Sequence, residues 1–463
     1  MSESLKHIFP YEPTPCQQTL LEALEEFVYG RDSKTDIMVV NGYAGTGKTT
    51  VMATLVKDLN SRKRRFRLMA PTGRAAKVLS AYTGHSALTI HKSIYRQKST
   101  DDWRGEFSIN ENKDTGTIYI VDEASLISVE GGGAFGSGNL LFDLISYVRQ
   151  GPRNKLILVG DNAQLPPIGM EESPSLSPNF LWQYGECRYV TLSSVVRQAA
   201  DSGILTNATV IRRAIEAEQV DDWPKMDDSF PDFRRITGGE LLEALQTSFD
   251  LYGADETVVL TRSNKRAIRY NFGIRKTILG IEEELCRGDK LMVVKNCYQF
   301  VDDLDQIPFI ANGDIVELVK IHRYDERYGL HFADATLSFP FYDDVEIEAK
   351  IILDTLNSES PSLTEEQQKT LYEGVMADYS HIRGYRMRQK AVREDLYYNA
   401  LQIKHAEAIT CHKAQGGQWS SVFVDNAFWY DEITTEDLKW LYTALTRATK
   451  QIYLVNFNKQ FFN

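Results

Sequence analysis

A glycine-rich octapeptide has the residue types and the spacing that bind the phosphates of a nucleotide. Residues 42–49 read Gly-Tyr-Ala-Gly-Thr-Gly-Lys-Thr and fit the pattern GxxxxGK[ST]. Glycines let backbone N–H groups converge on phosphate oxygens at a helix start, Lys48 would neutralise the β- and γ-phosphates, and Thr49 would ligate Mg²⁺. We therefore predict a nucleotide site formed by Gly42, Ala44, Gly45, Thr46, Gly47, Lys48, Thr49 and Thr50.

Two consecutive carboxylates follow an apolar stretch further along the chain. Residues 118–121 are Ile-Tyr-Ile-Val, and Asp122 and Glu123 come directly after them. A strand that ends in two acids brings one to a metal ion and the other to an attacking water. We predict that Asp122 holds Mg²⁺ with Thr49 and that Glu123 orients or deprotonates the water. Both motifs together predict nucleotide hydrolysis, a chemistry that motors, signalling switches and kinases share.

The elements that must position these residues are short apolar strands alternating with helices. A first series predicts a parallel sheet wrapped by helices, with strands at 37–40, 66–70, 116–121, 155–159 and 188–192 and a helix at 48–60. A second series predicts another α/β domain, with strands at 257–261, 421–425 and 452–455 and helices at 265–274 and 436–448. Between its parts, residues 279–398 carry strand-like runs and an Asn-Gly turn, so a β-rich insertion is expected.

Composition restricts the class of protein. Hydrophobic residues at 43% and charged residues at 25% are typical of folded globular proteins, and 463 residues predict several domains. The net charge of -12 requires that any nucleic acid be held by local groups. The 5 scattered cysteines form no CxxC pair, which favours a reducing, cytoplasmic setting without zinc. No stretch has the apolar length that a membrane span needs.

Several further segments resemble the motifs of superfamily 1 helicases. Residues 160–167, Gly-Asp-Asn-Ala-Gln-Leu-Pro-Pro, are similar to the third motif. Residues 410–418, Thr-Cys-His-Lys-Ala-Gln-Gly-Gly-Gln, are similar to the fifth motif in the form typical of the RecD-like and Dda-type branch. Segments similar to other motifs lie at 14–17, 70–76, 89–91, 192–198 and 441–448. The resemblance extends almost from end to end, except for residues 354–400, which match no part of the family pattern.

The resemblance implies an α/β fold of two RecA-like P-loop NTPase domains. The first domain would comprise residues 1–192, with a small hairpin-type insertion at 92–116. The second would comprise residues 193–278 and 401–463, interrupted by a β-rich, SH3-like insertion with a charged helical tail at 279–400.

The same resemblance implies roles around the nucleotide. Gln17 would read adenine, with the adjacent Gln18 as the alternative register. Gln164 would sense the γ-phosphate from the first domain. Two arginines of the second domain, Arg197 and Arg447, would reach across to that phosphate and make hydrolysis depend on domain closure.

The family resemblance also implies which residues hold the single strand of nucleic acid. Gln415 and Gly416 would lie near the nucleotide and link it to the strand site. Contacts to the single strand would come from Pro71, Thr72, Thr89, His91, Thr410, His412 and Lys413. In the insertion at 92–116, Trp103 or Phe107 would stack on the terminal base pair as a wedge, or would only pack locally.

The basic run at 62–65 is interpreted as a solvated helix end, where cations are favoured.

The expected activity is an ATP- and Mg²⁺-dependent DNA helicase that moves 5′ to 3′ on a single strand and unwinds forked duplexes. It would act as a cytoplasmic monomer, beside replication or repair proteins and away from membranes. RNA is an alternative substrate, because backbone contacts need not exclude a 2′-hydroxyl. A non-motor switch or kinase, or a scaffold that binds DNA without moving, is the alternative from another class. The second domain and the complete catalytic set argue against both.

Overall fold

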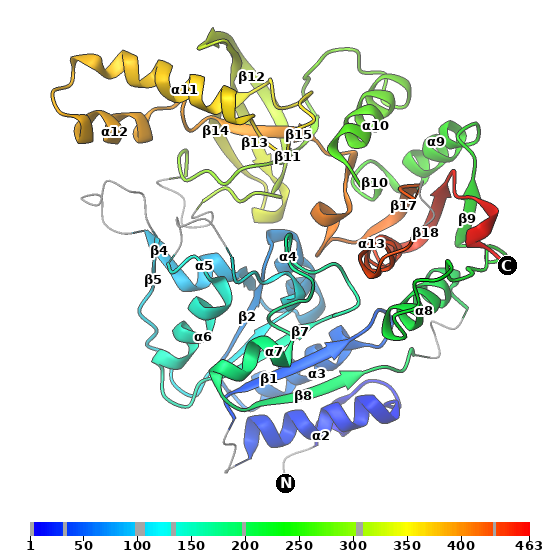
Figure 1. The fold of residues 1–463 in the computed structure, drawn as a ribbon. Helices are drawn as coiled ribbons and strands as arrows, with labels where there is room; N and C mark the ends of the chain where they lie inside the picture. The colour runs from blue at the N-terminus through cyan, green and yellow to red at the C-terminus, as the bar shows by residue number, and fades with distance from the viewer. Residues whose placement is uncertain are drawn as a thin grey trace.

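Two parallel sheets and a small barrel form the computed structural model, which describes residues 4–30, 35–97, 107–130, 136–196, 201–301, 309–428 and 432–463. The first sheet occupies the lower half of Figure 1, the second lies to the right and the barrel lies at the top. This arrangement matches the predicted fold class of two RecA-like domains with a β-rich insertion in the second. Within these residues, no helix is long and apolar enough to cross a membrane.

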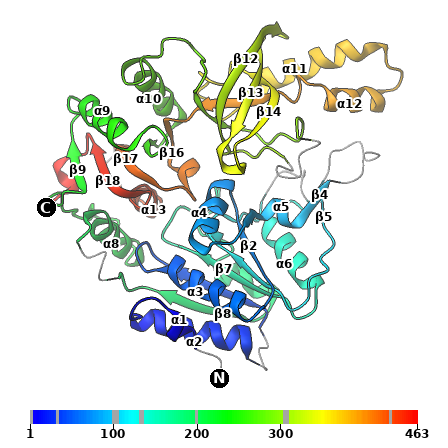
Figure 2. The same cartoon turned by 180° about the vertical axis from the view of Figure 1, so that it is seen from behind.

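The first sheet has the strand order β3-β2-β6-β7-β1-β8, and all neighbouring strands are parallel. Alternate residues of β1 face opposite layers of helices, because successive side chains of a strand point to opposite sides. Met38 and Val40 pack against α2 and α3, whereas Ile37 and Val39 face α6 on the other side. Helix α3 is seen in the view from behind in Figure 2. The strands are β1 (Ile37–Gly42), β2 (Phe66–Ala70), β3 (Ala87–Thr89), β6 (Ile118–Val121), β7 (Lys155–Gly160) and β8 (Cys187–Leu192).

The helices of this domain are α1 (Leu5–Ile8), α2 (Pro15–Tyr29), α3 (Lys48–Ser61), α4 (Gly73–Thr83), α5 (Ile90–Ile94), α6 (Leu140–Gln150) and α7 (Pro178–Leu181). After α5, the strands β4 (Tyr95–Gln97) and β5 (Phe107–Ile109) form an antiparallel pair, which is the expected hairpin-type insertion. Trp103 lies outside the described residues.

The second sheet is also parallel, with the order β16-β10-β17-β18-β9. Its strands are β9 (Phe233–Ile236), β10 (Thr257–Thr261), β16 (Ala408–Thr410), β17 (Trp419–Asp425) and β18 (Ala448–Val455). One face packs against α8 (Gly203–Glu216) and α13 (Thr435–Leu445), and the other packs against α9 (Leu241–Tyr252) and α10 (Asn264–Thr277).

A closed five-stranded barrel interrupts the second domain. Its strands are β11 (Lys290–Val293), β12 (Ile315–Arg327), β13 (Leu330–Phe339), β14 (Val345–Ile352) and β15 (Leu401–His405). Residues 401–405 therefore differ from the predicted assignment to the second RecA-like domain. They pair with β11 and β14, and all five are buried, as a strand covered on both faces requires.

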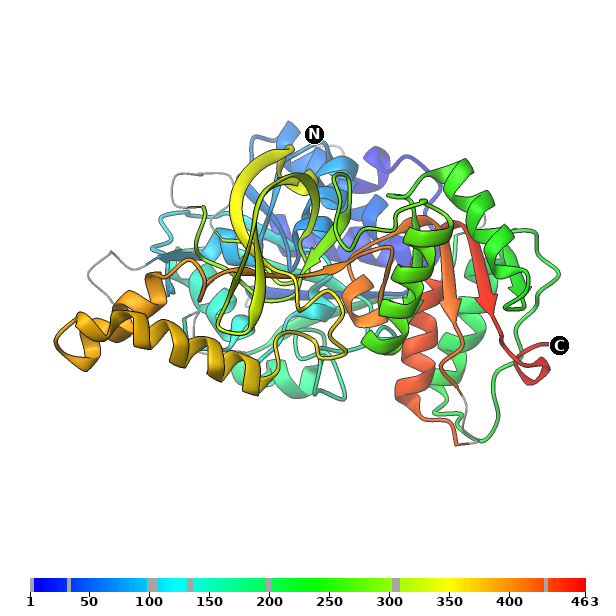
Figure 3. The same ribbon diagram turned by 90° about the horizontal axis from the view of Figure 1, so that it is seen from above.

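The unmatched stretch after β14 forms two helices that lie against the barrel. These are α11 (Glu365–Asp378) and α12 (Tyr385–Glu394). Leu371, Val375 and Val392 of these helices pack on Phe332 and Ile352 of the barrel. Seen from above in Figure 3, the two helices extend away from both sheets as an arm.

Candidate nucleotide and nucleic-acid sites

The phosphate loop joins β1 to α3 and has no room for side chains at its glycines. Gly45 and Gly47 have φ angles of 72° and 83°. A Cβ on Gly42 would lie 2.7 Å from Lys48 Cγ, and one on Gly47 would lie 2.6 Å from Gln17 Nε2. Gly47 caps α3 without a side-chain hydrogen bond, so the first amides of α3 have no capping acceptor. The loop therefore fits a phosphate group.

Two predicted nucleotide ligands are held by the protein itself. Lys48 Nζ donates to the carbonyl of Gly42 and, at 3.1 Å, to that of Tyr43. Gln17 is 3% exposed. Its Oε1 accepts from the N–H of Thr14 at 2.9 Å, and its Nε2 donates to the Thr46 carbonyl at 2.9 Å. To read adenine, Gln17 would have to exchange one of these bonds. Gln18 pairs with Glu22 along α2.

The acidic pair lies at the end of β6. In the sheet, β7 lies between β6 and β1, the strand that leads into the phosphate loop. Asp122 Oδ1 accepts from the N–H of Glu123 at 2.9 Å, and Glu123 has a left-handed backbone with φ 51°. Burial, reinforced by the Glu123 charge, raises the pKa of Asp122 to about 6. A cation bound there would relieve this cost, because it favours the charged carboxylate. The residues present therefore fit Mg²⁺.

Gln164 brings an unsatisfied acceptor to the same edge. It is 5% exposed, and its Oε1 has no hydrogen-bond partner among the described residues. A buried acceptor without a partner costs free energy unless a ligand or water supplies a donor. This position is consistent with the predicted role of Gln164 beside the phosphate.

Helix α13 of the second domain reaches the nucleotide edge of the first. The Tyr442 hydroxyl donates to Asp161 Oδ2 at 2.7 Å and accepts from the N–H of Ala44 at 2.9 Å. The N–H of Leu165 donates to Thr443 Oγ1 at 2.8 Å. Tyr442 was not among the predicted residues, although it stands in the segment similar to the sixth motif. It connects that segment directly to the phosphate loop.

Arg447, one of the two predicted arginines of the second domain, is bonded within that domain. Arg447 is 2% exposed, and its guanidinium donates to the carbonyls of Thr443 and Gly417 and to Thr446 Oγ1 at 3.0 to 3.1 Å. These bonds lie within the second domain, so Arg447 would have to release donors to reach a phosphate. Arg197 lies outside the described residues.

Arg212 of α8 was not predicted and lies beside the phosphate loop. Its guanidinium is 4.4 Å from the centre of the Tyr43 ring, and its buried Nε has no partner in the described part of the chain. Sequence reasoning had no signal for it, because an arginine in an amphipathic helix is ordinarily solvated.

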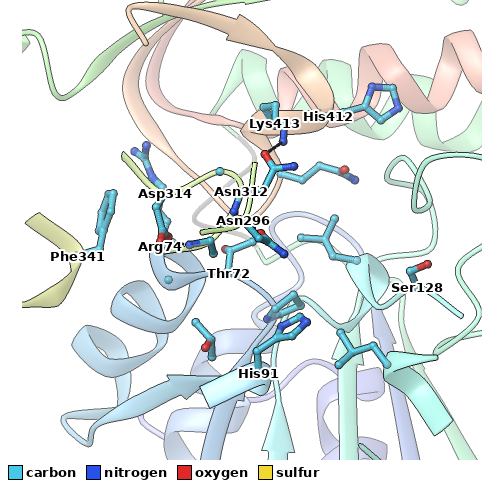
Figure 4. A pocket seen from close by; sticks show the side chains of 18 of the residues that line it. Thr72, Arg74, His91, Ser128, Asn296, Asn312, Asp314, Phe341, His412 and Lys413 are labelled. Carbon is cyan, nitrogen blue, oxygen red and sulfur yellow. Dashed lines mark hydrogen bonds between the residues drawn. The ribbon is translucent and has the colours of Figure 1, made fainter. Parts of the chain in front are cut away.

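A cavity of about 400 Å³ lies where the two sheets and the barrel meet, as Figure 4 shows. Six of the residues predicted to contact a single strand of nucleic acid lie on the cavity wall, and they come from both domains: Pro71, Thr72, Thr89, His91, His412 and Lys413. Thr410 ends β16 next to this wall without lining it. Gly416 lies on the cavity side rather than at the phosphate loop, since a Cβ there would be 3.1 Å from Thr72 Oγ1.

Gln415 connects the cavity to the nucleotide edge. Its side chain lines the cavity, and its Nε2 donates to the Leu165 carbonyl at 2.6 Å, next to Gln164. Both histidines of the cavity are held neutral, because burial lowers the pKa of His91 to about 4 and also lowers that of His412. Burial lowers the pKa of Lys413 to about 8, which leaves this side chain cationic near neutral pH.

Four further residues of the cavity wall were not predicted as contacts to the single strand. Arg74 lies 3.7 Å from the centre of the Trp419 ring and donates to the Gln418 carbonyl at 2.7 Å. Asn312 accepts a hydrogen bond from Lys413, and Phe341 lies beside Arg74, as Figure 4 shows. Arg74 stands in the segment 70–76 and Asn312 in the Asn-Gly turn. Phe341 and Trp419 carried no sequence signal of their own.

Phe107 is packed rather than presented to the solvent. It is 6% exposed, and its ring centroid lies 5.0 Å from that of Tyr298 and 6.2 Å from that of Phe309. The structure therefore shows the local packing that was the alternative to a wedge for this residue.

Comparisons with known proteins identify two domains. Residues 21–227 match the AAA domain family, and residues 405–455 match the UvrD-like helicase C-terminal domain family. The chain is 25% identical to the ATP-dependent DNA helicase dda of Enterobacteria phage T4, over 90% of this chain and 94% of that protein.

Other similarities cover less of the relative or are more distant. The chain is 31% identical to the ATP-dependent RecD2 DNA helicase of Deinococcus radiodurans over 37% of this chain and 21% of that protein. An uncharacterized protein of Methanocaldococcus jannaschii is 23% identical over 91% of this chain, which spans 37% of that protein's length. The crystal structure of a Pif1 helicase from Candida albicans superimposes with a TM-score of 0.44 at 16% identity, over 97% of this chain and 96% of the other.

Proposed function

We propose that this chain is a superfamily 1 helicase that couples ATP hydrolysis to movement along single-stranded DNA and to duplex unwinding. Its AAA domain, its UvrD-like helicase C-terminal domain and its full-length likeness to dda support this proposal. The proposed direction is 5′ to 3′, in line with the Dda-type form of residues 410–418. The proposed setting is the cytoplasm, with the chain acting as a monomer beside replication or repair proteins. All five cysteines are unpaired, as a reducing compartment requires.

The nucleotide would be held at the interface between the sheets. The amides at the start of α3 and Lys48 would bind its phosphates, and Thr49 and Asp122 would hold Mg²⁺, which neutralises charge that develops on the phosphates. Glu123, fixed in its left-handed conformation, would take the proton of the attacking water. Gln164 would orient that water through its unpaired Oε1.

The observation that carries the coupling is the position of Gln415. This side chain lines the cavity of about 400 Å³ where the two sheets and the barrel meet, which we call the strand cavity because it would hold the single strand. The same side chain is bonded to Leu165, and Leu165 is bonded in turn to α13. Any movement of α13 against the phosphate loop therefore alters the wall of the cavity. Alternating closure and opening of the two domains would then change the grip on the strand and move the protein along it.

The test compares wild type with Lys48→Ala, and with Lys57→Ala as a matched control on the exposed side of the same helix. ATP hydrolysis is measured without nucleic acid, with single-stranded DNA and with single-stranded RNA. Unwinding is measured on duplexes with only a 5′ or only a 3′ overhang. We expect DNA-stimulated hydrolysis in the wild type and the control, none in Lys48→Ala, and unwinding from the 5′ overhang. Hydrolysis indifferent to any strand, without unwinding, would leave a switch or kinase and refute the motor.

A further inference from the structure

Cations from two distant parts of the sequence surround a cleft of about 800 Å³ on the first domain. Lys63, Arg64 and Arg65 follow α3, whereas Arg153 and Lys155 come from the turn before β7 and from its first residue. The basic run at 62–65 was interpreted as a solvated helix end. Arg62 fits that interpretation, because it pairs with Asp58 at 2.7 Å. The other three face a second basic segment, which the sequence alone does not place beside them.

Among the residues that the structure describes, few carboxylates offset the positive charge of this cleft. Asp36 is the one carboxylate on its described wall, and Arg149 already binds it through bonds of 2.6 and 2.8 Å. Lys63, Arg64, Arg65 and Arg153 form no ion pair with any described residue. In a chain of net charge -12, this cluster is a local reversal of sign.

Two of these cations occupy backbone positions that favour glycine. Lys63 has φ 53° and Arg153 has φ 60°, both in the left-handed region. Glycine is the usual residue at such helix ends and turns, because a Cβ is strained there. The chain instead carries a long cationic side chain at both places. The structural role of each residue would be met at least as well by glycine, so the charges need another explanation.

The chemistry of the cleft suits phosphates and not bases. Tyr29 is the aromatic residue on its described wall, and the guanidinium of Arg62 lies 4.5 Å from the centre of its ring. The Tyr29 hydroxyl is bonded to Asp58 at 2.5 Å. A nucleobase would therefore find no open ring to stack on, whereas proteins that hold single strands combine cations with such rings. Cations without stacking platforms are typical of contacts to the backbone of a duplex.

We propose that this cleft binds the phosphodiester backbone of duplex DNA, as a second nucleic-acid site separate from the strand cavity. The inference rests on the proposed function, since it gives the motor a hold on duplex. Arg65 directly precedes β2 and Pro71, on the cavity wall, directly follows it, so the two sites lie at opposite ends of a strand. Five residues of strand span roughly 17 Å. In Figure 1, the end of α2, beside this cleft, lies at the bottom and the barrel at the top.

The test uses the double variant Lys63→Gly/Arg153→Gly, which removes both charges and relieves the backbone. Affinity for a blunt duplex is measured by fluorescence anisotropy without nucleotide, across a series of salt concentrations. Each lost phosphate contact lowers the slope of log K against log salt by about 0.9. We expect the slope to fall by about 1.8 and binding at 0.1 M salt to weaken by tens of fold. Affinity for a single strand should stay within twofold.

Two controls separate charge from other causes. Lys63→Arg/Arg153→Lys keeps both charges and should bind duplex as the wild type does. Lys450→Gln/Lys459→Gln removes two exposed charges from the second domain and should leave duplex binding unchanged. Unchanged duplex binding by the glycine variant, or an equal loss of single-strand and duplex affinity, would overturn the proposal. If hydrolysis proves indifferent to single strands while the duplex effect is present, the motor fails and the cleft stands.

Discussion

Replacing Tyr442 by phenylalanine tests whether α13 couples the two domains. The hydroxyl is removed and the ring is kept, so packing at this 1% exposed position is preserved. The change deletes the bond to Asp161, which is fully buried, and leaves the N–H of Ala44 in the phosphate loop without its acceptor. When the domains separate, both groups reach water. Losing the two hydrogen bonds therefore destabilises only the closed state, in which the domains are in contact.

The magnitude follows from these two bonds. A hydrogen bond to a charged group contributes about 1.5–3 kcal/mol, and a stranded buried donor costs about 1–3 kcal/mol. A combined loss of roughly 2.5–6 kcal/mol corresponds to a decrease of about 70-fold to more than 10,000-fold in the population of the closed state. We expect kcat/KM for ATP, measured with saturating single-stranded DNA, to fall by at least about 70-fold.

The matched control is Tyr270→Phe. The Tyr270 hydroxyl donates to Asp425 at 2.8 Å, which is a similar bond within the second domain. This variant should lose stability in urea but keep its hydrolysis rate. If Tyr442→Phe hydrolysed ATP within twofold of the wild type, the bridge would not control closure and the reasoning would be wrong.

Three further predictions concern two buried carboxyl groups and one glycine of the phosphate loop. Glu407 is 2% exposed and burial raises its pKa to about 7, so the folded state holds a proton that the unfolded state has released. The free energy of unfolding should fall as pH rises from about 4.5 through 7. Glu407→Gln should flatten this dependence and raise the free energy of unfolding by about 3 kcal/mol at pH 8, as measured by urea titration. A wild-type pH profile in the variant would contradict this. Burial also raises the pKa of Asp314 in the strand cavity to about 7. Asp314→Asn should therefore strengthen binding of a labelled single strand several-fold at pH 8 and little at pH 6, and an equal gain at both would count against this ionisation. Gly47→Ala should weaken ATP binding at least tenfold in calorimetry, because the added Cβ would clash with Gln17. Gly84→Ala, at φ 69° and with nothing within 4 Å, is the control that shows the effect of backbone strain alone. Equal effects of the two substitutions would exclude the clash as the cause.

Local patterns were enough for much of the fold. The strands that carry the phosphate loop and the acidic pair are continuous apolar runs, because parallel strands are buried on both faces, and their ends hold the residues whose chemistry is recognisable. The alternation of such runs with helices predicted both sheets. Strand-like runs and an Asn-Gly turn predicted the β-rich insertion, and the family resemblance predicted the hairpin.

Features set by distant contacts were not visible in the same way. β9, Phe-Arg-Arg-Ile, lies at the sheet edge with two exposed arginines, so its sequence resembles a loop. β15 was assigned to the wrong unit because only its pairing with β11 and β14 places it in the barrel. The inward bonds of Arg447 and the bridge of Tyr442 depend on how α13 docks, which spacing along the helix does not reveal.

The interruption of the second sheet by the barrel sets an order in which the chain can fold. β10 and β16 are neighbours in the sheet, yet the barrel and its arm separate them in sequence. Leu291 pairs with His405, so a finished barrel brings its two ends together. This shortens the loop to be closed from roughly 150 to roughly 30 residues and lowers its entropic cost by about 1 kcal/mol. During synthesis, the first sheet can form early, the barrel next, and the second sheet last. The proposed nucleotide site, which would use residues of both sheets, is thus assembled only when almost the whole chain has been made.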